Sequence, residues 1–219
     1  MSTRPSRLLP ALSVALLATC LAGPAAAQTV GQQVAAQCAT CHGQQGQSTS
    51  DEFPQLAGQN AQYLRKQLED FRSGQRQHTA MTAIAQGLSD AQIGAMASYF
   101  QAQTPVPHAS DDALLAGMGR YIYERGNIYS QVPACLSCHS ATGAGSARLP
   151  RLAGQHPQYV MTQLRRFQNK ERRNDSGAMA FVTQGLSELE LRAVAAYVGG
   201  LNPLPIKVNT SKTLSDQKP

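Results

Sequence analysis

The chain contains the same sequence pattern twice, and this internal repeat restricts its fold more than any other feature. Residues 56–71 match residues 152–167 at nine of sixteen positions, and both segments begin with Leu-Ala-Gly-Gln. Farther along, Gln-Gly-Leu-Ser at 86–89 recurs at 184–187, so the offset between the copies changes only from 96 to 98. Repetition at a nearly constant offset is typical of a tandem duplication. We therefore expect two copies of one small domain in this chain of 219 residues.

Each copy contains a Cys-x-x-Cys-His motif, which is the attachment signature of c-type haem. Two thiols three residues apart on one helical turn each form a thioether bond to a haem vinyl group, and the next residue reaches the iron as its proximal ligand. The motifs consist of Cys38, Cys41 and His42 in the first copy and Cys135, Cys138 and His139 in the second. The sequence therefore predicts two covalently bound haem c groups.

Disulfides, redox-active thiol pairs and a zinc site are the alternatives for these four cysteines. A disulfide does not require a histidine after each second cysteine, and a single zinc ion would leave both histidines without a role. Haem also explains the composition, because aromatic residues make up only 5% of the chain and tryptophan is absent. A haem supplies the large apolar surface around which a small domain can pack.

A methionine at the same place in both copies is the best candidate for the distal ligand of each iron. Met and His are the usual distal ligands, and Met81 and Met179 precede the repeated Gln-Gly-Leu-Ser block by the same distance. Small residues surround both methionines, which predicts a loop. His78 is the alternative for the first iron, although its counterpart is a serine. Met118 lies on a predicted helix, where we expect it to pack in the core.

Residues outside the motifs are candidates to contact the haem or its ligands. Pro54 and Pro150 precede the repeated Leu-Ala-Gly-Gln block, and we expect their carbonyl groups to orient the proximal imidazoles; a plain turn is the alternative. Arg65 and Arg151, together with tyrosines of the repeat, are candidates to reach the haem propionates.

The periodicity predicts an all-α protein, since no segment shows the alternation of a strand. The expected helices are residues 29–38, 61–73 and 111–125, the repeat containing Val160–Phe167, and two helices that begin after the capping serines Ser89 and Ser187. We assign residues 28–104 and 111–202 to the two haem domains, residues 105–110 to a proline-containing linker, and residues 203–219 to a mobile tail.

The first 27 residues have the features of a secretory signal peptide. A basic start precedes an apolar run from Leu8 to about Gly23, and small residues follow. We predict cleavage before Gln28 and export to a bacterial periplasm. A membrane anchor, and a lipoprotein acylated at Cys20, are the alternatives; Thr19 is a poor residue before a lipidated cysteine. No later stretch is long enough to cross a bilayer.

The two Cys-x-x-Cys-His motifs, the duplicated Leu-Ala-Gly-Gln blocks, the late methionines and the Gly-Leu-Ser helix starts together resemble the dihaem cytochrome c4 family. The resemblance covers about residues 28–202. It implies two tandem class I cytochrome c domains related by approximate two-fold symmetry, with haem propionates near their interface. It also implies electron delivery in the periplasm, often towards a membrane-bound terminal oxidase and near the membrane surface.

We therefore predict an electron-transfer protein with no catalytic residues, which exchanges electrons with an upstream donor and a terminal oxidase. Iron with both axial positions filled has no vacant site for a substrate. The alternatives are a dihaem oxidoreductase with one open iron, either peroxidase-like or thiosulfate-oxidising, and a gas-binding sensor. The net charge of +6 falls to +4 without the first 27 residues, which is too small an excess to indicate nucleic-acid binding. The oligomeric state is left open.

Overall fold

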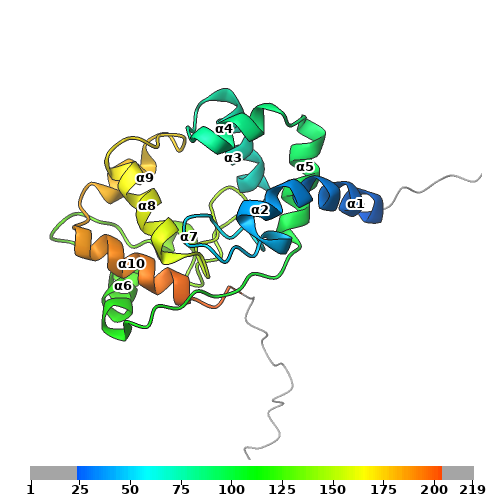
Figure 1. The fold of residues 1–219 in the computed structure, drawn as a ribbon. Helices are drawn as coiled ribbons and strands as arrows, with labels where there is room; N and C mark the ends of the chain where they lie inside the picture. Colours follow the sequence, from blue (N-terminus) through cyan, green and yellow to red (C-terminus); the bar gives the residue numbers. More distant parts are fainter. Residues whose placement is uncertain (1–23, 204–219) are drawn as a thin grey trace, which may run out of the picture.

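The computed structural model of the protein describes residues 24–203, whose regular structure is helical apart from one isolated bridge between Asn127 and Val132 (Figure 1). The first half contains α1 (Pro24–Ala35), η1 (Ala36–Cys38), α2 (Ala39–His42), η2 (Gln44–Gly46), α3 (Ala61–Ser73), α4 (Thr79–Gln86) and α5 (Asp90–Gln101). The second half contains α6 (Ala113–Arg125), α7 (Leu136–His139), α8 (Pro157–Gln168), α9 (Ala178–Thr183) and α10 (Glu188–Gly200). The all-α prediction is confirmed, and no helix within residues 24–203 has the length and apolar character needed to cross a membrane.

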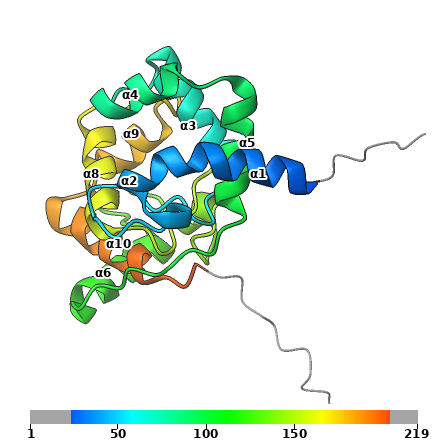
Figure 2. The same ribbon diagram turned by 45° about the vertical axis from the view of Figure 1, so that its right-hand side comes forward.

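The first and last helices of each half cross at a glycine. A Cβ atom on Gly31 of α1 would lie 2.5 Å from the carbonyl oxygen of Ala95 in α5. The same atom on Gly119 of α6 would lie 1.9 Å from the carbonyl oxygen of Ala193 in α10. Both distances are far below a van der Waals contact, so only glycine allows this approach. The α1–α5 and α6–α10 pairs therefore form the same framework twice, and Figure 2 shows α1 crossing α5.

Each half has its own apolar core, built from the face that each helix turns inward. In the first half, Leu64 and Leu68 of α3 pack with Ile93 and Phe100 of α5. The second core contains Ile122, Tyr123, Val132, Val160, Leu186, Leu191, Val194, Ala195 and Val198. Ser89 and Ser187 form the predicted capping boxes at the start of the last helices. These boxes satisfy backbone N–H groups that a helix start leaves without partners.

Reciprocal hydrogen bonds join the two halves across an approximate two-fold axis. The backbone N–H of Gln55 donates to Gln155 Oε1 (2.8 Å), and Gln155 Nε2 donates to the carbonyl of Gln55 (3.0 Å). At the equivalent positions, the backbone N–H of Arg151 donates to Gln59 Oε1 (2.7 Å), and Gln59 Nε2 donates to the carbonyl of Arg151 (2.9 Å). This exchange of equivalent contacts is the pattern of a two-fold interface, and it confirms the symmetry that the family resemblance implied.

The segment that joins α5 to α6 is extended and forms hydrogen bonds with both halves. The backbone N–H of Val106 donates to Gln55 Oε1 (2.9 Å), and that of His108 donates to the carbonyl of Gly199 (2.8 Å). The linker therefore runs across the interface between the halves. Most of the predicted signal peptide and of the predicted tail lies outside the described residues.

Candidate functional site

The eight residues predicted to hold the two haems line one cavity of about 1610 Å³ between the halves. These residues are Cys38, Cys41, His42 and Met81 from the first half and Cys135, Cys138, His139 and Met179 from the second. The short helices α2 and α7 each end at the histidine of a Cys-x-x-Cys-His motif. The fold thus brings both motifs, which are far apart in the sequence, to the wall of the same space.

Each motif histidine is held by a backbone carbonyl. Nδ1–H of His42 donates to the carbonyl of Pro54 (2.9 Å), and Nδ1–H of His139 donates to the carbonyl of Pro150 (3.1 Å). These contacts confirm the predicted role of the two prolines, and they leave Nε2 as the nitrogen available to a metal. Burial lowers the pKa of both imidazoles, although the carbonyl hydrogen bonds act in the opposite direction. Burial therefore favours the neutral form of both histidines, which is the form that ligates iron.

The motif cysteines form two pairs, each with one inner and one outer member. Cys38 and Cys135 are half-buried, whereas Cys41 and Cys138 are exposed. Burial raises the pKa of the Cys38 and Cys135 thiols to about 11. Within residues 24–203 no group of three or more His, Cys, Asp or Glu residues could hold a metal ion, so the cysteine pairs do not meet in a zinc site.

The two repeated methionines lie in the first turns of α4 and α9, so the prediction that they lie in loops was wrong. Side chains at the helix starts stabilise these turns: His78 Nδ1 accepts from the backbone N–H of Met81 (3.4 Å), and Asp175 Oδ2 accepts from that of Met179 (2.6 Å). Such hydrogen bonds to backbone N–H groups help these short helices to form. Met118 was also predicted wrongly, since it is 38% exposed on α6 rather than buried in the core.

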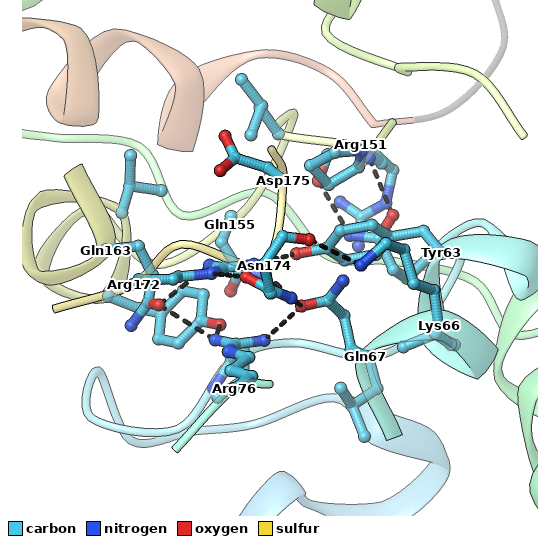
Figure 3. A pocket seen from close by; sticks show the side chains of 18 of the residues that line it. Tyr63, Lys66, Gln67, Arg76, Arg151, Gln155, Gln163, Arg172, Asn174 and Asp175 are labelled. Carbon is cyan, nitrogen blue, oxygen red and sulfur yellow. Dashed lines mark hydrogen bonds between the residues drawn. The ribbon is translucent and has the colours of Figure 1, made fainter. Parts of the chain in front are cut away.

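A buried polar cluster lies between the halves and was not predicted from the sequence (Figure 3). Arg76 donates to Gln67 Oε1 (2.9 Å) and to Gln163 Oε1 (2.9 Å). Arg172 donates to the same two oxygens, also at 2.9 Å. Each arginine also bonds to the tyrosine hydroxyl of the opposite half, Tyr159 for Arg76 and Tyr63 for Arg172. One signal in the sequence could have indicated this cluster: Arg76 and Arg172 are 96 positions apart, which is the offset between the two copies of the repeat.

Arg151 and Arg65, the two arginines predicted as candidates to reach the haem propionates, lie in different environments. Arg151 is 3% exposed, and its guanidinium group donates to the carbonyl oxygens of Gly58, Ala57 and Ala153. Burial lowers its pKa to about 10. Arg65 does not line the cavity; it forms an exposed ion pair with Glu69 (2.8 Å) on α3. Arg65 is therefore not placed to reach a propionate.

These features define the class of protein. The cavity offers paired thiols, a carbonyl-oriented imidazole and a thioether in each half, and this donor set fits covalently attached haem rather than an isolated metal ion. Apolar residues of both cores also line it, including Leu64, Phe71, Val160 and Phe167. The fold and the site are those of a dihaem c-type cytochrome.

Comparisons with known proteins give the family. The family model described as cytochrome c matches residues 28–104, and that of the cbb3-type cytochrome c oxidase subunit III matches residues 122–198. The chain is 37% identical to cytochrome c4 of Pseudomonas aeruginosa, over 90% of this chain and 100% of that protein. It is 39% identical to the thiosulfate dehydrogenase electron acceptor of Stutzerimonas stutzeri, over 73% of this chain and 76% of that protein.

The solved structure of reduced recombinant cytochrome c4 from Pseudomonas stutzeri superposes with a TM-score of 0.76 and 35% identity, covering 80% of this chain and 98% of that chain. The chain therefore belongs to the cytochrome c4 family. It carries two covalently bound haem c groups and acts as an electron-transfer cytochrome.

Proposed function

We propose that the protein is a periplasmic carrier of single electrons between an upstream donor and a membrane-bound terminal oxidase, with no catalytic residues. In this proposal residues 28–104 and 111–202 are the two haem domains. The thioether bonds form at Cys38 and Cys41 in the first domain and at Cys135 and Cys138 in the second. The axial ligands are His42 and Met81 for the first iron, and His139 and Met179 for the second.

The observation that carries this proposal is the repeated methionine on the cavity wall. When bound, each haem supplies one-electron redox chemistry, and the chain controls that chemistry through its own side chains. The carbonyl groups of Pro54 and Pro150 fix the imidazole rings. Met81 and Met179 would each supply a thioether ligand, which would favour the reduced iron and fill the position that a substrate would need. The two sites line one cavity, so we expect electrons to pass between the halves.

The comparisons and the sequence support particular partners and a location. Similarity to a thiosulfate dehydrogenase electron acceptor supports a dehydrogenase of that kind as one donor, and membership of the cytochrome c4 family supports an oxidase as acceptor. The pattern of residues 1–27 supports export and a periplasmic location. The second candidate function is a dihaem oxidoreductase in which one iron is open.

Carbon monoxide distinguishes the carrier from the oxidoreductase. We expect the reduced wild-type protein to bind none, because all axial positions are filled. Met179→Ala should open one iron, so that carbon monoxide binds one haem per chain and the oxidised protein loses part of its long-wavelength methionine–iron absorption band. Met161→Leu is the matched control, since Met161 packs against the second core outside the cavity lining and the substitution conserves volume. Carbon monoxide binding to the wild-type protein would instead support the oxidoreductase.

A further inference from the structure

The second half contains a surface loop that the first half lacks. Cys135 lies sixteen positions after Gly119, but Cys38 lies only seven positions after the equivalent Gly31. The second half thus has nine additional residues between these positions. Residues 127–132, between α6 and the second Cys-x-x-Cys-His motif, form a turn that we call the 127–132 loop. Neither the haem-attachment motif nor the distal methionine uses these residues, so the loop requires another explanation.

The loop has a defined conformation that several contacts stabilise. The backbones of Asn127 and Val132 form two hydrogen bonds (2.8 and 2.9 Å), and Asn127 Nδ2 donates to Glu190 Oε1 (2.7 Å) in the capping box of α10. Val132 is only 4% exposed and belongs to the second core. The loop also packs against Gly185, where a Cβ atom would lie 2.2 Å from the carbonyl oxygen of Ser130. Its tip is thus held in place from both sides.

The tip presents two large apolar side chains to solvent. Ile128 is 81% exposed and Tyr129 is 93% exposed. A soluble protein gains nothing in its own folding from such exposure, whereas rigid, exposed Tyr and Ile side chains are typical anchors of a protein interface. The base of the loop continues directly into the haem cavity, because Pro133, Ala134 and Cys135 line it. A partner seated on the tip is therefore a few residues from the second haem.

Charge indicates the chemistry of the partner. Residues 111–202 contain ten Lys and Arg residues against seven Asp and Glu residues, while residues 28–104 contain four against five. The two halves thus carry formal charges of +3 and −1, and the exposed Arg125 lies two residues before the start of the loop. The loop itself contains no charged residue. A membrane-binding loop combines apolar residues with clustered Lys and Arg, so this composition favours a protein.

We propose that the 127–132 loop is the docking surface of the second haem for a protein redox partner, which offers an apolar patch surrounded by acidic side chains. This inference rests on the proposed carrier function and names the half of the molecule that meets the acceptor. In the docked complex the partner gains one electron and the second haem is oxidised from the ferrous to the ferric state. No bond forms or breaks, and no proton moves.

The test uses purified cbb3-type oxidase as the probe, with the holoprotein kept reduced by ascorbate and oxygen consumption as the readout. We expect Tyr129→Ser to raise the KM for the cytochrome about tenfold and to leave kcat unchanged. Tyr121→Ser is the matched control, because Tyr121 is also exposed (66%) but lies on α6 rather than on the loop. The reduction potentials and absorption spectra of both variants should equal those of the wild type.

The possible results separate this inference from the function on which it rests. A wild-type protein that the oxidase cannot oxidise overturns the oxidase as acceptor and the docking assignment with it. Normal wild-type kinetics with an unchanged KM for Tyr129→Ser, or an equal increase for Tyr121→Ser, overturn the docking assignment alone. Sedimentation with vesicles of phosphatidylglycerol and phosphatidylcholine gives the last comparison. Vesicle binding that Tyr129→Ser abolishes, with oxidase kinetics unchanged, would assign the loop to a membrane instead.

Discussion

Single glutamine oxygens hold the two buried arginines at the centre of the molecule. Gln67 Oε1 accepts hydrogen bonds from Arg76, Arg172 and Asn174, each at 2.9 Å. An amide oxygen has two lone pairs and carries no charge, so the two guanidinium groups share it without forming an ion pair. Burial disfavours an ionised Tyr63, but the nearby guanidinium groups of Arg172 and Arg76 lower its pKa below the usual range. The sequence repeat marks these residues as equivalent but does not say that they meet.

Replacing this acceptor tests its importance. We expect Gln67→Leu to lower the free energy of unfolding by about 2–3 kcal/mol, because buried N–H donors of two arginines then lack a partner. Gln86→Leu, the same substitution at an exposed site at the end of α4, should change it by less than about 0.5 kcal/mol. Denaturant titration of both holoproteins supplies the measurement. Equal stabilities for the two variants would mean that the arginines find their partners elsewhere.

At the scale of helices, the sequence predicted most elements because local signals determine them. The spacing of Leu64, Leu68 and Phe71 indicated α3, and the capping boxes indicated the starts of α5 and α10. Asn60 and His156 occupy the N-cap positions of α3 and α8, yet neither side chain caps its helix. Asn60 Nδ2 donates to the carbonyl of Leu149 and His156 Nε2 to that of Ser48, both in the opposite half. At both positions a hydrogen bond to the opposite half takes the place of the local N-cap hydrogen bond.

Two glycines of α6 give a direct test of how the terminal helices cross. Gly119→Ala should lower the free energy of unfolding by about 2–3 kcal/mol, since its methyl group would overlap the Ala193 carbonyl and separate α6 from α10. Gly117 has nothing within 4 Å of the same position. Gly117→Ala should therefore raise the stability by about 0.5–1 kcal/mol through helix propensity. Thermal or denaturant unfolding measures both changes, and a loss of stability in both variants would contradict the assigned crossing.

At the scale of the whole molecule, the sequence predicted two similar halves but not how they contact each other. Repeated residues appear in the sequence as equivalent positions, and a two-fold axis can pair them in many ways. The structure pairs Gln55 with Gln155 and Gln59 with Arg151, which no periodicity encodes. Features that occur in one half only, such as the 127–132 loop, have no counterpart in the repeat, so the repeat could not predict them either. Residues that occur at equivalent positions in both copies therefore indicate a role common to the two halves. Residues present in only one copy indicate a role of that half alone.

A histidine pair at the interface between the halves should make the stability of the molecule depend on pH. The rings of His108 and His156 lie 3.7 Å apart, and His156 Nε2 donates to the carbonyl of Ser48 (2.9 Å). Burial, and then the charge of His108, lower the pKa of His156 in the folded protein; the Ser48 carbonyl and Asp51 oppose this shift. The unfolded chain, with an ordinary histidine pKa of about 6.5, consequently binds more protons in mildly acidic solution.

The contribution of His156 to stability is therefore complete above about pH 6.5 and decreases as the pH falls below that value. We expect the free energy of unfolding of the wild-type holoprotein to fall between about pH 7 and pH 5, and His156→Asn, which installs the residue of the first copy, Asn60, to reduce this fall. His108→Gln should also reduce it, because His156 then titrates without a charged neighbour. Denaturant titrations across this pH range provide the measurement. A wild-type slope that neither variant alters would show that the pair does not couple protonation to the contact between the halves.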